Sequence, residues 1–162
     1  MFKFVVIAAF AVILSQGLTP AANFQISSVL GVNLNAVAYN NVNDTWASQC
    51  LGFYFTQSGN QISMNTTLWA NPTPENFTLT VDGSDDAIWE LTSDDVYWVY
   101  ADNVNQVYGF TDSGNMVGYV LSPNWNVSDI WIIKAIAGMI LNGVPISATD
   151  MSFAPSSCAS YP

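Results

Sequence analysis

The sequence predicts an all-β protein, an eight-stranded antiparallel up-and-down barrel with one C-terminal α-helix packed outside it. Three observations lead to this expectation. Apolar and polar residues alternate along most of the chain, short turn sequences separate the alternating segments, and one segment with helical spacing follows them. Eight antiparallel strands close into a barrel just wide enough for one small ligand.

The alternation is clearest on the two sides of the turn at residues 58–60. Apolar residues of this hairpin lie two positions apart within each arm: Phe53, Phe55, Ile62 and Met64. The residues between them, including Tyr54 and Asn65, belong to the opposite face. One face is therefore expected to line an apolar interior, and the other is expected to meet water.

Eight segments are expected to form the strands: 36–39, 51–55, 62–69, 77–81, 87–91, 96–101, 106–110 and 116–121. Turn sequences rich in Asp, Ser, Gly and Asn, such as residues 82–86 and 111–115, separate several of them. Pro72 and Pro74 cannot donate to a central ladder, so residues 71–74 are expected to be a connection. In the segments 96–101 and 106–110 both faces are apolar, and the pattern does not assign the inward side.

Residues 128–141 have the spacing of an α-helix. The side expected to face the barrel carries Ile130, Ile133, Ala137, Ile140 and Leu141. Asn142-Gly143 and Pro145 predict where the helix ends. Residues 146–153 are expected to add a final edge strand.

The remaining sides of this helix are also apolar, and such a helix is normally buried all round. We therefore expect an exposed patch that joins a second copy of the chain in a homo-oligomer: Trp131, Ile132, Ala135 and Met139. The alternative is that the tail, residues 146–162, covers this patch.

The first residues have the features of a secretion signal. Lys3 precedes an unbroken apolar run over residues 4–14, which is too short to span a bilayer. We expect a signal peptide at residues 1–17, with cleavage between residues 17 and 22, and a single domain over residues 18–162. The protein is therefore expected to be secreted and extracellular, with no membrane span in the mature chain.

Oxidation and glycosylation are both expected in that compartment. Cys50 and Cys158 are the two cysteines of the chain, and pairing them is the default in an oxidising environment. Four Asn-x-Ser/Thr sequons predict N-linked glycans at Asn43, Asn65, Asn76 and Asn126. Asn65 and Asn76 lie on the solvent-facing side of the expected sheet.

The charge balance excludes several functions. Loss of Lys3 with the leader takes the formal net charge from −10 to −11 and leaves Lys134 as the one basic residue, so no nucleic-acid partner is expected. The chain has no histidine, which removes Ser–His and Cys–His catalysis and a His-ligated haem. The acidic turn at residues 82–86 does not have EF-hand spacing. We expect no enzyme, no metal and no cofactor other than a bound lipid or pigment.

The order of eight strands, one helix, a strand and a tail cysteine resembles the lipocalins, and local motifs resemble their insect bilin-binding and apolipoprotein D branch. Residues 30–39 resemble the Gly-x-Trp motif and first strand of that family. Thr92-Ser93-Asp94 resembles its Thr-Asp motif, and residues 118–122 resemble the strand of its third motif. Cys50 and Cys158 match the pair that links the second-strand region to the tail.

The chain also departs from the family at two positions. Asn33 stands where the motif has Trp, and Pro123 stands where an Arg usually packs across that Trp. The closed end of the barrel is therefore expected to be sealed in another way. The second disulfide of the bilin-binding branch has no cysteines here.

The resemblance implies a small hydrophobic ligand in the barrel mouth, such as a fatty acid, terpenoid, odorant or pigment. Relatives place pocket residues where this chain has Phe55, Met64, Thr66 and Tyr119. The full set expected to point inward is Val37, Tyr39, Phe53, Phe55, Ile62, Met64, Thr66, Leu79, Trp89, Tyr119 and Leu121.

Two other functions are consistent with the same sequence. The large rings can simply fill the interior, which would make the barrel a structural or self-assembling extracellular protein. A lipocalin of the salivary type, which blocks a protein partner through its loops, is the third possibility.

Overall fold

The computed structural model describes residues 17–40, 49–72, 74–91, 95–113 and 117–162. Its strands are β1 (Asn33–Asn40), β2 (Leu51–Ser58), β3 (Gln61–Leu68), β4 (Glu75–Asp82), β5 (Asp85–Glu90), β6 (Asp95–Asp102), β7 (Val107–Asp112), β8 (Gly118–Ser122) and β9 (Ser152–Phe153). The helix α2 (Asp129–Leu141) and three 3₁₀ turns, η1 (Ile26–Ser28), η3 (Ala148–Asp150) and η4 (Ser156–Ser160), complete it. Within these residues no helix is both long and apolar enough to cross a membrane.

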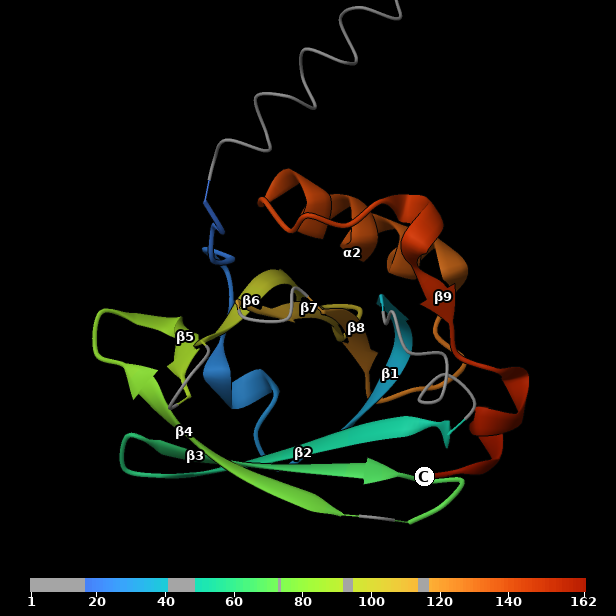
Figure 1. Ribbon diagram of the computed structural model, residues 1–162, viewed down its shortest axis with the longest axis horizontal. Helices are drawn as coiled ribbons and strands as arrows, with labels where there is room; N and C mark the ends of the chain where they lie inside the picture. The colour runs from blue at the N-terminus through green and yellow to red at the C-terminus, as the bar shows by residue number, and fades with distance from the viewer. Residues whose placement is uncertain (1–16, 41–48, 73, 92–94, 114–116) are drawn as a thin grey trace, which may run out of the picture.

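The first eight strands form a closed antiparallel barrel, with α2 packed outside it (Figure 1). Each strand from β1 to β8 pairs with the next, and β1 also pairs with β8, which closes the sheet. The predicted fold class and the order of its strands are confirmed. The expected final strand is shorter than predicted, because η3 occupies residues 148–150 and leaves β9 only Ser152–Phe153 beside β1.

A β-bulge in β1 changes which side chains point inward. The pairing of β1 with β8 shifts register between Ala36 and Ala38. An extra residue in a strand reverses the alternation beyond it. Ala36 and Tyr39 therefore belong to the barrel core, whereas Val37 packs beneath α2. The prediction that Val37 points into the barrel is wrong for this reason.

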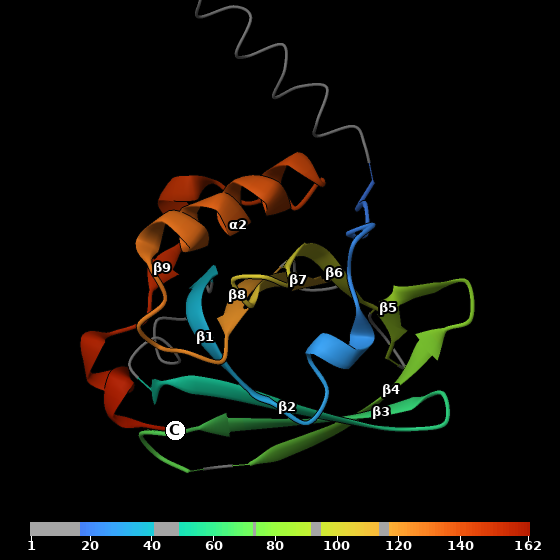
Figure 2. The ribbon, with the colours of Figure 1, turned by 180° about the vertical axis from the view of Figure 1, so that it is seen from behind.

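The chain before β1 seals one end of the barrel. Figures 1 and 2 show η1 and its flanks folded into that end. The Phe24 ring stacks on Trp98 with centroids 4.8 Å apart, and Val29 is fully buried. Gly31 has a φ of +70° and donates its N–H to the Phe55 carbonyl at 2.8 Å. This packing stands where the resemblance placed a Trp and an Arg.

Helix α2 turns a different side to the barrel from the one predicted, and of the predicted set only Ile140 packs against the cluster beneath the helix. Its buried residues are Ile132, Ala135, Ile136 and Met139, whereas Ile130, Ile133 and Leu141 are exposed. Ile132, Ala135 and Met139 therefore cannot be the exposed patch expected from the sequence. Trp131 is partly buried and packs against the same cluster, with the Lys134 Nζ 4.0 Å from its ring centroid.

Small residues on the barrel wall explain this orientation. Gly109 of β7 and Gly118 of β8 lie under Met139, and a Cβ added at either position would come within 3 Å of the Met139 side chain. Met139 therefore fits against the sheet where no side chain intervenes. The helix has apolar residues on all sides, so its own sequence carries no polar stripe to mark the solvent side.

A disulfide joins the tail to the start of β2. Cys50 and Cys158 are bonded, with an S–S distance of 2.04 Å and a sequence separation of 108 residues. The predicted pairing is confirmed. In the chain-entropy description, closing a loop of about 100 residues stabilises a fold by about 4.7 kcal/mol.

Substitution of Gly109 tests the close approach of α2. Gly109→Ala should lower the free energy of unfolding by about 1–3 kcal/mol, because the added methyl overlaps Met139 and Tyr100. Gly83→Ala is the matched control, since a Cβ at this turn meets no atom within 4 Å. Urea denaturation of both variants measures the difference. Equal stability of the two variants would contradict the packing described here.

Candidate ligand-binding site

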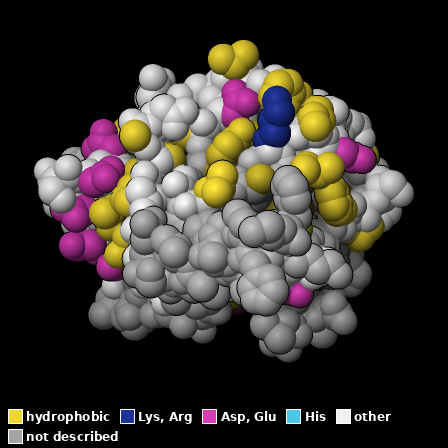
Figure 3. All heavy atoms as spheres, turned by 90° about the horizontal axis from the view of Figure 1, so that it is seen from above, with side chains coloured by type: hydrophobic (Ala, Val, Ile, Leu, Met, Phe, Trp, Pro, Cys, Tyr) yellow, Lys and Arg dark blue, Asp and Glu magenta, His cyan; other side chains and the backbone are white. Residues whose placement is uncertain are grey.

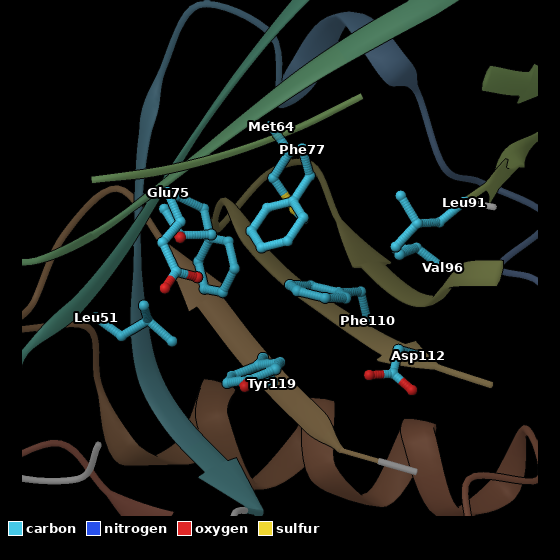
Figure 4. A pocket seen from close by; sticks show the side chains of 11 residues that line it. Leu51, Met64, Glu75, Phe77, Leu91, Val96, Phe110, Asp112 and Tyr119 are labelled. Carbon is cyan, nitrogen blue, oxygen red and sulfur yellow. The ribbon is translucent and has the colours of Figure 1, made fainter. Parts of the chain in front are cut away.

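The barrel holds a cavity of about 280 Å³ at the end opposite η1, which we call the mouth. β2, β4, β6 and β8 begin at the mouth, and β3, β5 and β7 end there. Figure 4 shows side chains from these strands converging on the space. The lining residues are Leu51, Phe53, Met64, Thr66, Glu75, Phe77, Leu91, Val96, Phe110, Asp112 and Tyr119.

Three aromatic rings form one wall of the cavity. Phe110 and Tyr119 are stacked with centroids 5.1 Å apart. Phe53 meets both rings edge-on, at 5.3 Å from Phe110 and 5.4 Å from Tyr119. Each ring comes from a different strand, so the wall is held by the sheet itself. It offers a ligand a large apolar surface.

The other half of the barrel is filled. Trp89 and Trp98 are fully buried and meet at 5.0 Å, and Phe55 lies 5.2 Å from Trp89 and 5.6 Å from Trp98. Phe24 closes this group from the chain before β1. The cavity therefore lies at the mouth and does not extend into this half.

The inward residues expected from the sequence divide into three groups. Phe53, Met64, Thr66 and Tyr119 line the cavity. Six others lie in the barrel core without lining it: Tyr39, Phe55, Ile62, Leu79, Trp89 and Leu121. Val37 lies beneath α2, as described above.

Sequence reasoning missed seven lining residues: Leu51, Glu75, Phe77, Leu91, Val96, Phe110 and Asp112. The signal for two of them was present in the alternation. Glu75 precedes Phe77 by two positions and Asp112 follows Phe110 by two, so each shares the inner face with its aromatic neighbour. Phe110 and Val96 lie in strands whose two faces are both apolar, and their parity became clear only from the pairing of β6 with β7.

Four polar side chains face the cavity: Thr66, Glu75, Asp112 and Tyr119. Thr66 and Glu75 are register partners on β3 and β4. Burial, with a smaller contribution from the Asp112 charge, raises the pKa of Tyr119 to about 12, so its hydroxyl stays protonated at physiological pH. Over the described part of the chain, no three His, Cys, Asp or Glu residues form a group that could bind a metal ion.

The raised pKa of Tyr119 predicts a loss of stability in alkali. The unfolded chain loses this proton near pH 10 and the folded chain near pH 12, so the stabilisation is complete below pH 10 and falls as the pH rises to 12. Between pH 9 and pH 12 the wild type should lose roughly 2–3 kcal/mol more of its unfolding free energy than Tyr119→Phe. Urea titrations at both values measure this difference, and equal losses would contradict it.

No protein-family model and no curated protein matches this sequence. Solved structures match over most of the chain. Lobster apocrustacyanin A1 superposes with a TM-score of 0.60 at 13% identity, covering 83% of this chain and 82% of its own. The cockroach allergen Per a 4 has a TM-score of 0.59 at 14% identity, covering 91% and 98%.

A third similar structure is the siderocalin Ex-FABP, described as functioning through dual ligand specificities. Its TM-score is 0.59 at 11% identity, and the match covers 80% of this chain and 95% of that one. All three proteins are lipocalins, and their likeness to this chain lies in the barrel and its outer helix. The chain therefore has the lipocalin fold.

Proposed function

We propose that this chain is a secreted protein that binds one small hydrophobic molecule in the mouth of its barrel. The observation that carries the proposal is the cavity itself, a concave apolar space with a few polar groups around it, which is the usual form of a small-molecule site. The dual ligand specificities of the siderocalin Ex-FABP support a binding role for a barrel of this kind.

The size of the cavity limits the ligand. At the packing density of protein interiors, about 0.74, a space of about 280 Å³ holds roughly 200 Å³ of van der Waals volume. A molecule with up to three rings, or with a short chain, is therefore favoured over a large pigment. The filled half of the barrel leaves no room for a longer ligand to extend inward.

Two features of the described residues support secretion. The disulfide suits an oxidising compartment. The sequon residues Asn65 and Asn76 are register partners on the outer face of β3 and β4, and Asn126 is exposed, so glycans there would point away from the cavity. The proposed signal peptide, residues 1–17, lies almost wholly outside the described residues, and Asn43 lies outside them.

The second candidate function is self-assembly, and an exposed apolar stripe on α2 favours it. We define this stripe as Ile130, Ile133 and Leu141, whose exposed fractions are 52%, 53% and 66%. Figure 3 shows apolar side chains around Lys134, seen from the side of the molecule that α2 covers. The stripe replaces the interface predicted at Ile132, Ala135 and Met139, which are buried.

Filling the cavity tests the binding proposal. Thr66→Phe places a ring in the lumen and should weaken binding of N-phenylnaphthylamine, an uncharged fluorescent probe, by about tenfold or more, because the ring occupies the space of the probe. Thr56→Phe is the matched control, since Thr56 is exposed on β2. Fluorescence titration measures both affinities. Undiminished binding by Thr66→Phe would remove the cavity as the site.

A charge in the stripe tests self-assembly. If α2 joins two copies, Ile133→Asp should convert the dimer to a monomer, because an unpaired carboxylate would be buried at the interface. Val104→Asp is the control, since Val104 is 90% exposed on the β6–β7 turn and is not part of the stripe. Analytical ultracentrifugation at several concentrations measures the mass. A wild-type monomer, or a dimer that survives Ile133→Asp, rules this interface out.

A further inference from the structure

Two carboxyl groups face the apolar cavity. Glu75 is the first residue of β4 and Asp112 is the last residue of β7, and both strand ends lie at the mouth. Figure 4 shows their carboxyl groups on two sides of the space, with the rings of Phe110 and Tyr119 between them. They are the charged residues of a lining that is otherwise apolar and aromatic, apart from the hydroxyl groups of Thr66 and Tyr119.

No basic side chain lines the cavity. Beyond residue 3 the chain contains a single basic residue, Lys134, and this residue lies on the outer helix above the ring of Trp131. An anionic ligand in the mouth would therefore meet two carboxylates and no counter-ion from this protein. Taking its charge out of water would be unfavourable. Fatty acids and other carboxylates are therefore disfavoured ligands on electrostatic grounds.

A cation would meet the opposite situation. The faces of aromatic rings attract cations within about 6 Å, and Phe53, Phe110 and Tyr119 form a continuous wall at the same place. Glu75 and Asp112 supply charge-assisted acceptors for N–H donors. The net charge of −11 in the mature chain also raises the local concentration of cations at the mouth.

We propose that the cavity is specific for a small cationic amphiphile, an amine carried on an apolar or aromatic body. The body lies against the aromatic wall, and the ammonium group lies at the mouth beside Glu75 and Asp112. This inference rests on the proposed function, because it names the class of ligand for the same cavity. Among the hydrophobic ligands expected from the fold, the proposal favours amines and disfavours acids.

Three ligands with one skeleton test the charge preference: 3-phenylpropylamine, 3-phenylpropanol and 3-phenylpropanoate. Each is titrated at pH 7 into the mature, disulfide-bonded chain by calorimetry and by displacement of N-phenylnaphthylamine. We expect the amine to bind about tenfold more tightly than the alcohol, because its ammonium group donates charge-assisted hydrogen bonds to the two carboxylates. The acid should bind more weakly than the alcohol.

Removing the two charges tests their role. The double variant Glu75→Gln/Asp112→Asn should lose about tenfold in affinity for the amine and keep its affinity for the alcohol, because the shape of the cavity is retained. Glu90→Gln is the matched control. Glu90 is, like Glu75, an exposed carboxylate at the same end of the barrel, but it does not line the cavity.

The results separate this inference from the proposed function. Equal binding of amine, alcohol and acid, tighter binding of the acid, or unchanged amine affinity in the double variant would overturn the charge preference while leaving a carrier role in place. Binding of the probe without its displacement by the amine would overturn it too. If neither the probe nor any of the three ligands binds, the proposed function itself fails.

Discussion

Burial of large aromatic rings in one half of the barrel determines the rest of the structure. Trp98 lies at the centre of this group, with Phe24, Phe55 and Trp89 at centroid distances of 4.8, 5.6 and 5.0 Å. These rings come from the segment before β1, from β2, β5 and β6, so one packed cluster joins parts of the chain that are distant in sequence. Aromatic pairs add about 0.5–1.5 kcal/mol each beyond the burial of their area. The cavity described above lies at the mouth, away from this packed cluster.

On the outer face of the barrel, glycines lie where the helix approaches the sheet. Gly109 and Gly118 let Met139 contact the sheet, and this contact fixes the rotation of α2 about its axis. Ile130, Ile133 and Leu141 are exposed as a consequence. Their exposure therefore follows from the orientation of the helix on the sheet. The apolar stripe does not depend on how the barrel interior is packed.

Strand alternation was enough to predict most of the fold. In the hairpin of β2 and β3, the inward positions of Phe53, Phe55, Ile62 and Met64 follow directly from the sequence. The alternation failed where an extra residue entered a strand, as at Val37, because a bulge has no period of its own. It gave no answer for Phe110, whose strand is apolar on both faces. The orientation of α2 depended on glycines in other elements, which helical spacing alone does not include.

Some residues of the candidate site could likewise be predicted from strand alternation, whereas others could be assigned only from the folded structure. Thr66 and Tyr119 could be placed in the lumen from parity, whereas Glu75 and Asp112 became part of the site only when the strands were extended to the mouth. A carboxyl group at a strand end is usually solvated. Glu75 is exposed and Asp112 is partly buried, and both line one ligand-sized space beside the aromatic wall. For the ligand that we propose, the filled half of the barrel limits the length, and the two carboxyl groups at the mouth set the preferred charge.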